Sequence, residues 1–161
     1  MSMNACSFTG HRRIKPSHKN ALFGLLMRAV NYAYEQGCRE FFCGGAVGFD
    51  TEAARAVLLF RIDHPDARLI LLLPCQEQDD GWSYSQRDAY GYILKAADEI
   101  RYTSDYYTKN CMKIRNQALA DSCDILISYL SESRSGAGQT VRMAEKQGKP
   151  VYNLYPTLEN I

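Results

Sequence analysis

The sequence predicts a three-layer α/β domain in which helices cover both faces of a mostly parallel sheet. Short apolar runs alternate with longer segments of helical period along nearly the whole chain, which is the order of a parallel sheet with right-handed crossovers. The apolar run at residues 69–73 has no polar alternation, as expected for a strand covered on both faces. With 161 residues and neither a repeat nor a linker, the chain is expected to form one domain over residues 1–161.

Each expected strand is a short run rich in apolar residues that stops at a glycine, a proline or a polar segment. In chain order the strands cover residues 5–9, 40–43, 68–73, 99–102, 124–129 and 151–155. The first strand stops at Gly10 and the second at Gly44. The third stops at Pro74, which lacks the backbone N–H that a sheet ladder needs.

Each expected helix lies between two strands and carries apolar residues at three- and four-residue steps. In chain order the helices cover residues 22–33, 51–62, 83–97, 112–122 and 138–147. Leu22 and Leu26 lie on the apolar face of the first helix, and Gly37 marks its end. Val57 and Leu58 belong to the apolar face of the second. The alternation of strands and helices therefore continues to the end of the chain.

The bulk composition excludes several classes of protein. With a formal net charge of +1, the protein has no overall positive potential that would favour DNA binding. No basic segment followed by an apolar core opens the chain at residues 1–4, and no apolar stretch is long enough to cross a membrane, so a cytoplasmic protein without a membrane partner is expected. The six cysteines form no C-x-x-C pair and have no histidine at ligand spacing, which favours reduced thiols in the core and no metal site.

Polar or glycine-rich segments come directly after four of the expected strands. These segments are residues 9–13, 44–50, 103–105 and 131–138. The carboxyl ends of parallel strands meet at one edge of the sheet, and this edge is where α/β proteins bind ligands. The sequence therefore predicts a site there.

Two of these segments carry glycines and open a helix, namely residues 43–50 and 135–140. Glycines let backbone N–H groups approach a ligand closely, and the helix behind them adds unpaired donors and a positive dipole end. Two such segments in one small domain predict a nucleotide-type ligand.

Several motifs together resemble the SLOG superfamily, which joins the Smf/DprA proteins with the LOG (lysine decarboxylase-like) proteins. They are Thr9-Gly10-His11-Arg12, the segment from Gly44 to Asp50, Arg115-Asn116, the segment from Ser135 to Gly138, and Gly148-Lys149-Pro150-Val151. The opening Phe-Thr-Gly-His-Arg, Trp82 and the Ala97-Asp98 pair are similar to the small YpsA-like branch. The resemblance implies a Rossmann-like fold with a pocket for a nucleotide or a nucleotide-derived ligand such as ADP-ribose. The expected ligand-binding residues are Thr9, Gly10, His11, Arg12, Gly44, Gly45, Gly48, Asp50, Arg115, Asn116, Ser135, Gly136, Gly138 and Thr140.

Chemistry suggests different roles for the two glycine-bearing segments. Asp50 is expected to cap a helix that begins at Thr51, because aspartate is among the best N-cap residues. Its carboxylate would repel a phosphate and accept hydrogen bonds from ribose hydroxyls. The segment at residues 135–140 has no carboxylate, so the phosphate is assigned to it, with Arg12 as a bidentate partner. His11 and Arg13 rank behind Arg12 as phosphate ligands.

Four aromatic side chains could stack on a base, since every base has a π-face. They are Trp82, Tyr84, Tyr106 and Tyr107. Packing against the sheet is the more common fate of such residues, and it is expected for at least two of the four.

No recognisable nucleophile–base pair or metal motif occurs in the sequence. LOG-type phosphoribohydrolases carry a glutamate that supports cleavage of the N-glycosidic bond, and its position here falls on Arg142 or Met143. Asp50, Glu52 or Glu145 would have to substitute, and Asp50 is the candidate catalytic residue.

Three functions therefore stay open. The first is binding of a small-molecule nucleotide by a sensor or regulatory module, with no cofactor required. The second is a nucleotide N-glycosidase or hydrolase. The third is binding of single-stranded nucleic acid, as in Smf/DprA proteins, which ranks last because the chain is close to neutral. The sequence is also compatible with a homo-oligomer.

Overall fold

The structure, a computed structural model, describes residues 3–161. Met1 and Ser2, which belong to the expected domain and to the N-terminal segment discussed above, lie outside the described residues. Within that range, six strands form one all-parallel sheet in the order β4-β3-β2-β1-β5-β6. The strands are β1 (Ala5–Gly10), β2 (Glu40–Cys43), β3 (Arg68–Leu73), β4 (Glu99–Tyr102), β5 (Ile125–Tyr129) and β6 (Val151–Asn153).

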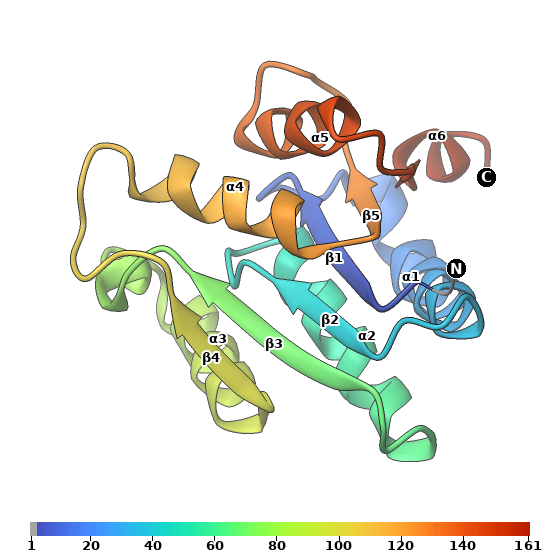
Figure 1. Cartoon of the computed structure of the whole chain (residues 1–161), viewed down its shortest axis with the longest axis horizontal. Helices are drawn as coiled ribbons and strands as arrows, with labels where there is room; N and C mark the ends of the chain where they lie inside the picture. Colours follow the sequence, from blue (N-terminus) through green and yellow to red (C-terminus); the bar gives the residue numbers. More distant parts are fainter. Residues whose placement is uncertain (1–2) are drawn as a thin grey trace.

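Helices cover both faces of this sheet (Figure 1). One face carries α1 (Lys19–Glu35), α2 (Phe49–Asp63) and α3 (Tyr84–Ala96), and the other carries α4 (Cys111–Ser122) and α5 (Gly136–Lys146). The short helix α6 (Tyr155–Glu159) follows the last strand, and 3₁₀ helices occupy Pro16–His18 and Gln76–Asp79. The three-layer α/β prediction is confirmed. None of the helices in residues 3–161 has the length and apolar character needed to cross a membrane.

The main hydrophobic core lies between the sheet and α1–α3, and smaller apolar clusters lie on the side of α4 and α5. Phe8, Phe41, Phe49 and Tyr129 are among the largest side chains that are fully buried. All six cysteines are buried and free, in agreement with the reduced core thiols that the lack of C-x-x-C pairs favoured. The inner strands β1, β2, β3 and β5 are buried along nearly their whole length because helices cover both faces of the sheet, whereas the edge strand β4 is largely exposed.

Local signals explain where several elements begin. The side chain of Ser83 accepts a hydrogen bond from the backbone N–H of Gln86, and the side chain of Gln86 accepts one from the backbone N–H of Ser83, so a complete capping box opens α3. The end of the chain differs from the prediction: the strand expected over residues 151–155 stops at Asn153, and Tyr155 begins α6. Pro156 in the first turn favours a helix start, and Leu158 is buried in the main core.

The order of the strands reverses direction at the boundary between β1 and β5. From β1 the chain continues toward β4 on one side of the sheet, whereas β5 and β6 lie on the other side. The connections that leave β1 and β5 therefore diverge onto opposite faces and leave a crevice at the carboxyl ends of these two strands.

Candidate functional site

A cavity of about 380 Å³ lies in this crevice, and we call it the central cavity. Nine of the fourteen expected ligand-binding residues line it, namely Thr9, Gly10, His11, Arg12, Asp50, Arg115, Asn116, Ser135 and Gly136. The other five, which do not line it, are Gly44, Gly45, Gly48, Gly138 and Thr140. The fold thus brings together residues that are more than one hundred positions apart in the sequence.

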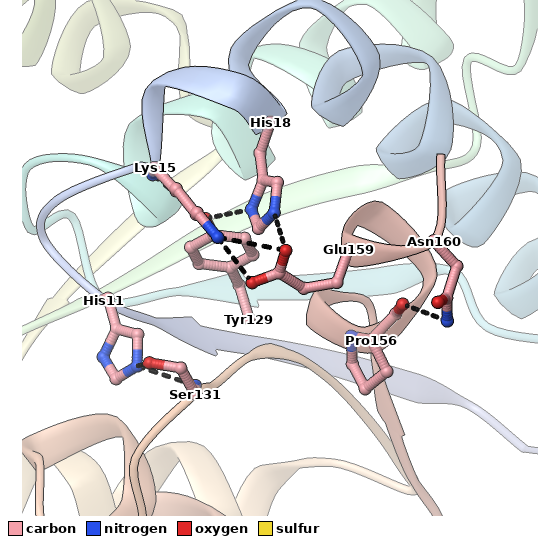
Figure 2. Close-up of polar contacts among 8 residues, drawn as sticks. All are labelled: His11, Lys15, His18, Tyr129, Ser131, Pro156, Glu159 and Asn160. Carbon is pink, nitrogen blue, oxygen red and sulfur yellow. Dashed lines mark hydrogen bonds and ion pairs between the residues drawn. The ribbon is translucent and has the colours of Figure 1, made fainter.

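The end of β1 supplies one wall of the central cavity. The ring of His11 is held by the backbone of Ser131, whose N–H donates to Nε2 at 2.9 Å (Figure 2). Since Nε2 accepts this bond, neutral His11 carries its proton on Nδ1. Burial lowers the pKa of His11, and Glu132 opposes that shift. Arg12 is exposed and takes part in none of the ion pairs within residues 3–161.

The first glycine-bearing segment contributes Ala46 and Asp50 to the wall of the central cavity, but its glycines do not line the cavity. Gly48 has a φ of 81°, and a Cβ at this position would collide with the backbone carbonyl of Arg12. Gly45 has a φ of 71°. The carbonyl of Gly44 accepts a hydrogen bond from Nη1 of Arg115 at 2.5 Å. These glycines therefore permit a tight turn and a close backbone approach.

The expectation that Asp50 caps a helix beginning at Thr51 is wrong. The turn at Gly48 starts α2 two residues earlier, at Phe49, and places Asp50 inside its first turn. There Oδ2 accepts a hydrogen bond from the backbone N–H of Ala46 at 3.2 Å, whereas Oδ1 is buried with no partner. Burial raises the pKa of Asp50 to about 6, although the positive charges of Arg115 and Arg12 act in the opposite direction.

Arg115 and Asn116 are buried side chains of α4 that face the central cavity. Besides the carbonyl of Gly44, Nη1 of Arg115 lies 3.3 Å from Oε1 of Gln78. Nδ2 of Asn116 donates to Oε1 of Gln139 on α5 at 3.1 Å. Arg115 therefore contacts the first glycine-bearing segment and Asn116 contacts the second. Side chains on the exposed face of α4 could not make these contacts.

The second glycine-bearing segment is the beginning of α5. Ser135 is its N-cap and accepts a hydrogen bond from the backbone N–H of Gly138 at 3.1 Å. Gly136 and Ala137, whose N–H groups belong to the unpaired first turn of the helix, line the cavity. Gly138 has another reason to be glycine, because a Cβ there would collide with the backbone carbonyl of Ser133.

Sequence reasoning missed several residues of the site. Met112 and Leu119 line the cavity, and their spacing from Arg115 places all three on one face of α4, so helical periodicity could have found them. Ala46 and Ala137 also line it. Gln78, which contacts Arg115, carried no signal because only the fold brings Gln76–Asp79 to this place.

None of the four aromatic candidates for base stacking lines the central cavity. Trp82 is half-buried and packs edge-on against Tyr90, with ring centroids 5.0 Å apart. Tyr84, Tyr106 and Tyr107 are exposed, so the expectation that at least two of the four pack against the sheet is wrong. Residues 103–105, expected at the same edge, do not line the cavity either, because β4 is the outermost strand.

Comparisons with known proteins identify the family of the chain. A model of the YpsA SLOG family matches residues 15–156. The chain belongs to the YpsA SLOG family. The resemblance seen in the sequence motifs is thereby confirmed.

Relatives of this YpsA SLOG protein include UPF0398 proteins of Bacillus thuringiensis (strain Al Hakam) and Bacillus cereus (strain AH187). Each is 28% identical over 132 residues, which cover 81% of this chain and 72% of the relative.

Two solved structures of DNA processing protein A share the fold. The protein from Helicobacter pylori, studied for its single-stranded DNA binding mode, superposes with a TM-score of 0.63 at 22% identity, over 92% of this chain and 63% of that one. The protein from Streptococcus pneumoniae gives 0.65 at 18% identity, over 92% and 49%. The YpsA SLOG chain thus spans less than two thirds of either structure, and at these identities the likeness concerns the fold alone.

Among the acids considered as replacements for the LOG-type glutamate, only Asp50 lines the central cavity of this YpsA SLOG protein. Glu52 forms an ion pair with Arg55 at 3.3 Å, and Glu145 is exposed on α5. Arg142 is exposed and Met143 is half-buried, and neither lines the cavity. Within residues 3–161, no three His, Cys, Asp or Glu side chains gather in a way that could hold a metal ion.

Replacing Asp50 with Asn should change how the stability of this YpsA SLOG protein depends on pH. The folded-state pKa of about 6 lies above the ordinary aspartate pKa of 3.8, so the folded state binds more protons between these two values. The Asp50 contribution to the free energy of unfolding therefore falls as pH rises from about 4 to about 6 and then stays constant. Asp50→Asn abolishes this loss, so its stability relative to the wild type should increase by up to about 3 kcal/mol over that window. Urea unfolding at pH 4, 5, 6 and 7 measures the difference, and parallel pH profiles for the two proteins would contradict the assignment.

Proposed function

We propose that this protein binds a nucleotide or a nucleotide-derived ligand, such as ADP-ribose, in the central cavity and acts as a sensor or regulatory module. One observation carries the proposal: anion-binding groups and a buried carboxyl group line the same cavity. The anion-binding groups are Arg12 and the first turn of α5, and the carboxyl group is that of Asp50, whose buried Oδ1 has no hydrogen-bond partner among residues 3–161.

The two kinds of group match the two polar parts of a nucleotide. The N–H groups of Gly136 and Ala137 would bind a phosphate together with the guanidinium of Arg12, which has no ion-pair partner to leave among residues 3–161. Oδ1 of Asp50 would accept a hydrogen bond from a ribose hydroxyl. An unsatisfied buried oxygen is costly, so a ligand hydroxyl that pairs with it would bind favourably. The volume of about 380 Å³ is within the range of small-molecule sites.

Replacing Arg12 with Gln should weaken nucleotide binding without weakening the fold. Loss of one charge-assisted phosphate contact should lower the affinity by about tenfold or more. The thermal unfolding midpoint of the unliganded protein should stay unchanged, because Arg12 is exposed. Calorimetric titration with AMP, ADP-ribose, NAD and ATP measures the affinity, and Arg28→Gln on the exposed surface of α1 is the matched control. If none of the four ligands binds the wild-type protein, the proposal fails.

Hydrolysis of the nucleotide is a second candidate function, and the environment of Asp50 favours it. A buried carboxyl with a pKa of about 6 can take up or release a proton near neutral pH, as a general base must. Mass spectrometry of the titrated mixtures separates the two functions. Recovery of intact ligand supports the sensor, whereas release of free base or ribose phosphate that Asp50→Asn abolishes supports the hydrolase.

Single-stranded nucleic acid is the third candidate, and a short oligonucleotide belongs in the same titration. The shared fold with DNA processing protein A supports its inclusion, while the near-neutral net charge of +1 argues against it. Strong binding at physiological salt, with a steep loss of affinity as salt increases, would place this function first.

A further inference from the structure

Two further cavities meet the central cavity at Arg12, which lines all three. One of them has a volume of about 490 Å³, and we call it the basic cavity. We propose that the basic cavity is a subsite for a second phosphate of the ligand, so that the cognate ligand carries two phosphates on either side of the Arg12 side chain. This inference rests on the proposed function, because it extends the ligand of the central cavity.

The charges around the basic cavity favour an anion. Arg12, Arg13 and Lys15 line it, and Glu132 is its only acid. Lys15 is already paired with Glu159, with Nζ 2.8 Å from Oε1. The guanidinium groups of Arg12 and Arg13 have no ion-pair partner within residues 3–161, so two positive charges face a single exposed carboxylate. Planar guanidinium groups are well suited to bind phosphate oxygens in pairs.

His11 adds a donor at the boundary between the central and basic cavities, both of which it lines. Because Ser131 occupies Nε2, the remaining ring nitrogen of neutral His11 carries a proton that it can donate. This donor belongs to a ring whose position the backbone of Ser131 fixes.

Hydrogen bonds and ion pairs connect the residues at the far wall of the basic cavity. The hydroxyl of Tyr129 lies 2.7 Å from Nδ1 of His18 and accepts a hydrogen bond from the backbone N–H of Lys15 at 3.1 Å (Figure 2). Nε2 of His18 lies 3.5 Å from Oε2 of Glu159, and Figure 2 shows Lys15 and His18 meeting at that carboxylate. The ion pair between Glu159 and Lys15 connects α6 to the segment that carries Arg13 and Lys15. These contacts hold the backbone next to Arg13 in place, which lowers the entropic cost of ordering this segment around a ligand.

The third cavity that Arg12 lines is less suited to an anion. It has a volume of about 310 Å³ and lies between the beginnings of α2 and α3. Its other arginine, Arg55, is paired with Glu52 at 3.3 Å, so among the described residues Arg12 is the only cation on its wall without such a partner. A second phosphate is therefore better placed in the basic cavity.

Calorimetric titration with AMP, ADP and adenosine 3′,5′-bisphosphate tests the inference. ADP and adenosine 3′,5′-bisphosphate are the two longer probes. ADP carries both phosphates on the 5′ oxygen, whereas the bisphosphate carries one on the 5′ and one on the 3′ oxygen. The two probes therefore separate a diphosphate ligand from one built like a nucleic-acid backbone. At least one of them should bind about tenfold more tightly than AMP. Arg13→Gln should remove this gain while AMP binds as before, and Glu132→Gln should increase the gain, since it removes the opposing charge. Arg28→Gln is the matched control and should change neither affinity.

The outcomes separate the subsite from the proposed function. If AMP binds but neither longer probe gains affinity, or if the gain survives Arg13→Gln, the second subsite is wrong and the proposed function stands. If no probe binds at all, the proposed function fails and the subsite fails with it. Opposite effects of Arg13→Gln and Glu132→Gln would support the subsite, and misfolding cannot produce them, because it weakens binding in both variants.

Discussion

Replacing Arg115 with Met should destabilise the protein by about 3–5 kcal/mol at pH 7.5. The variant loses the hydrogen bonds of Nη1 to the carbonyl of Gly44 and to Gln78, both of which are in a buried environment. It also removes the largest favourable influence on the charged form of Asp50, which lies in the same buried region. A buried carboxylate without a compensating charge is costly. Urea unfolding of the variant and the wild type measures this loss.

The pH dependence of that loss identifies its cause. Without Arg115 the pKa of Asp50 should rise further above about 6, because the positive charge of Arg115 no longer favours the carboxylate. Near pH 5 both proteins hold a largely protonated Asp50, so the cost of Arg115→Met should be smaller there than at pH 7.5. The double variant Asp50→Asn/Arg115→Met removes the carboxylate and should recover part of the stability at pH 7.5. An equal cost at both pH values would mean that only the hydrogen bonds of Arg115 matter.

Replacing Gly48 with Ala should destabilise the protein by about 3 kcal/mol or more. A φ of 81° is unfavourable for any residue with a side chain, and the new Cβ would collide with the carbonyl of Arg12. Relief of this collision would require movement of the backbone at Arg12, in the wall of the central cavity. Nucleotide binding should therefore weaken together with the thermal unfolding midpoint.

Gly24→Ala is the matched control for Gly48→Ala. Gly24 lies within α1, and a Cβ at this position would meet no atom within 4 Å. Alanine is a better helix former than glycine, so the control should gain about 0.5–1 kcal/mol. If the two alanine variants had similar stabilities, the close approach of Gly48 to Arg12 would not be a constraint on the fold.

The sequence by itself determined the class of fold and the edge of the sheet where a site belongs. Hydrophobic periodicity is a local property, so the strands at Arg68–Leu73 and Glu99–Tyr102 could be predicted at their observed bounds. The position of polar segments after strands then followed from the geometry of parallel sheets. Helix starts were less predictable, because a start depends on turns such as the one at Gly48, whose positive φ appears only in the folded chain.

The tertiary structure alone decided which residues share the cavity and in what chemical state. Asp50 has the sequence signal of a helix cap, yet it lies within the first turn of α2 on the wall of the cavity, where burial raises its pKa to about 6. Gly136 and Gly138 are two residues apart, yet the first lines the cavity and the second packs against the backbone of Ser133. Burial and close approach depend on the atoms that distant segments bring to a residue. Sequence spacing sets the periodicity of an element, but only the packed fold sets these surroundings.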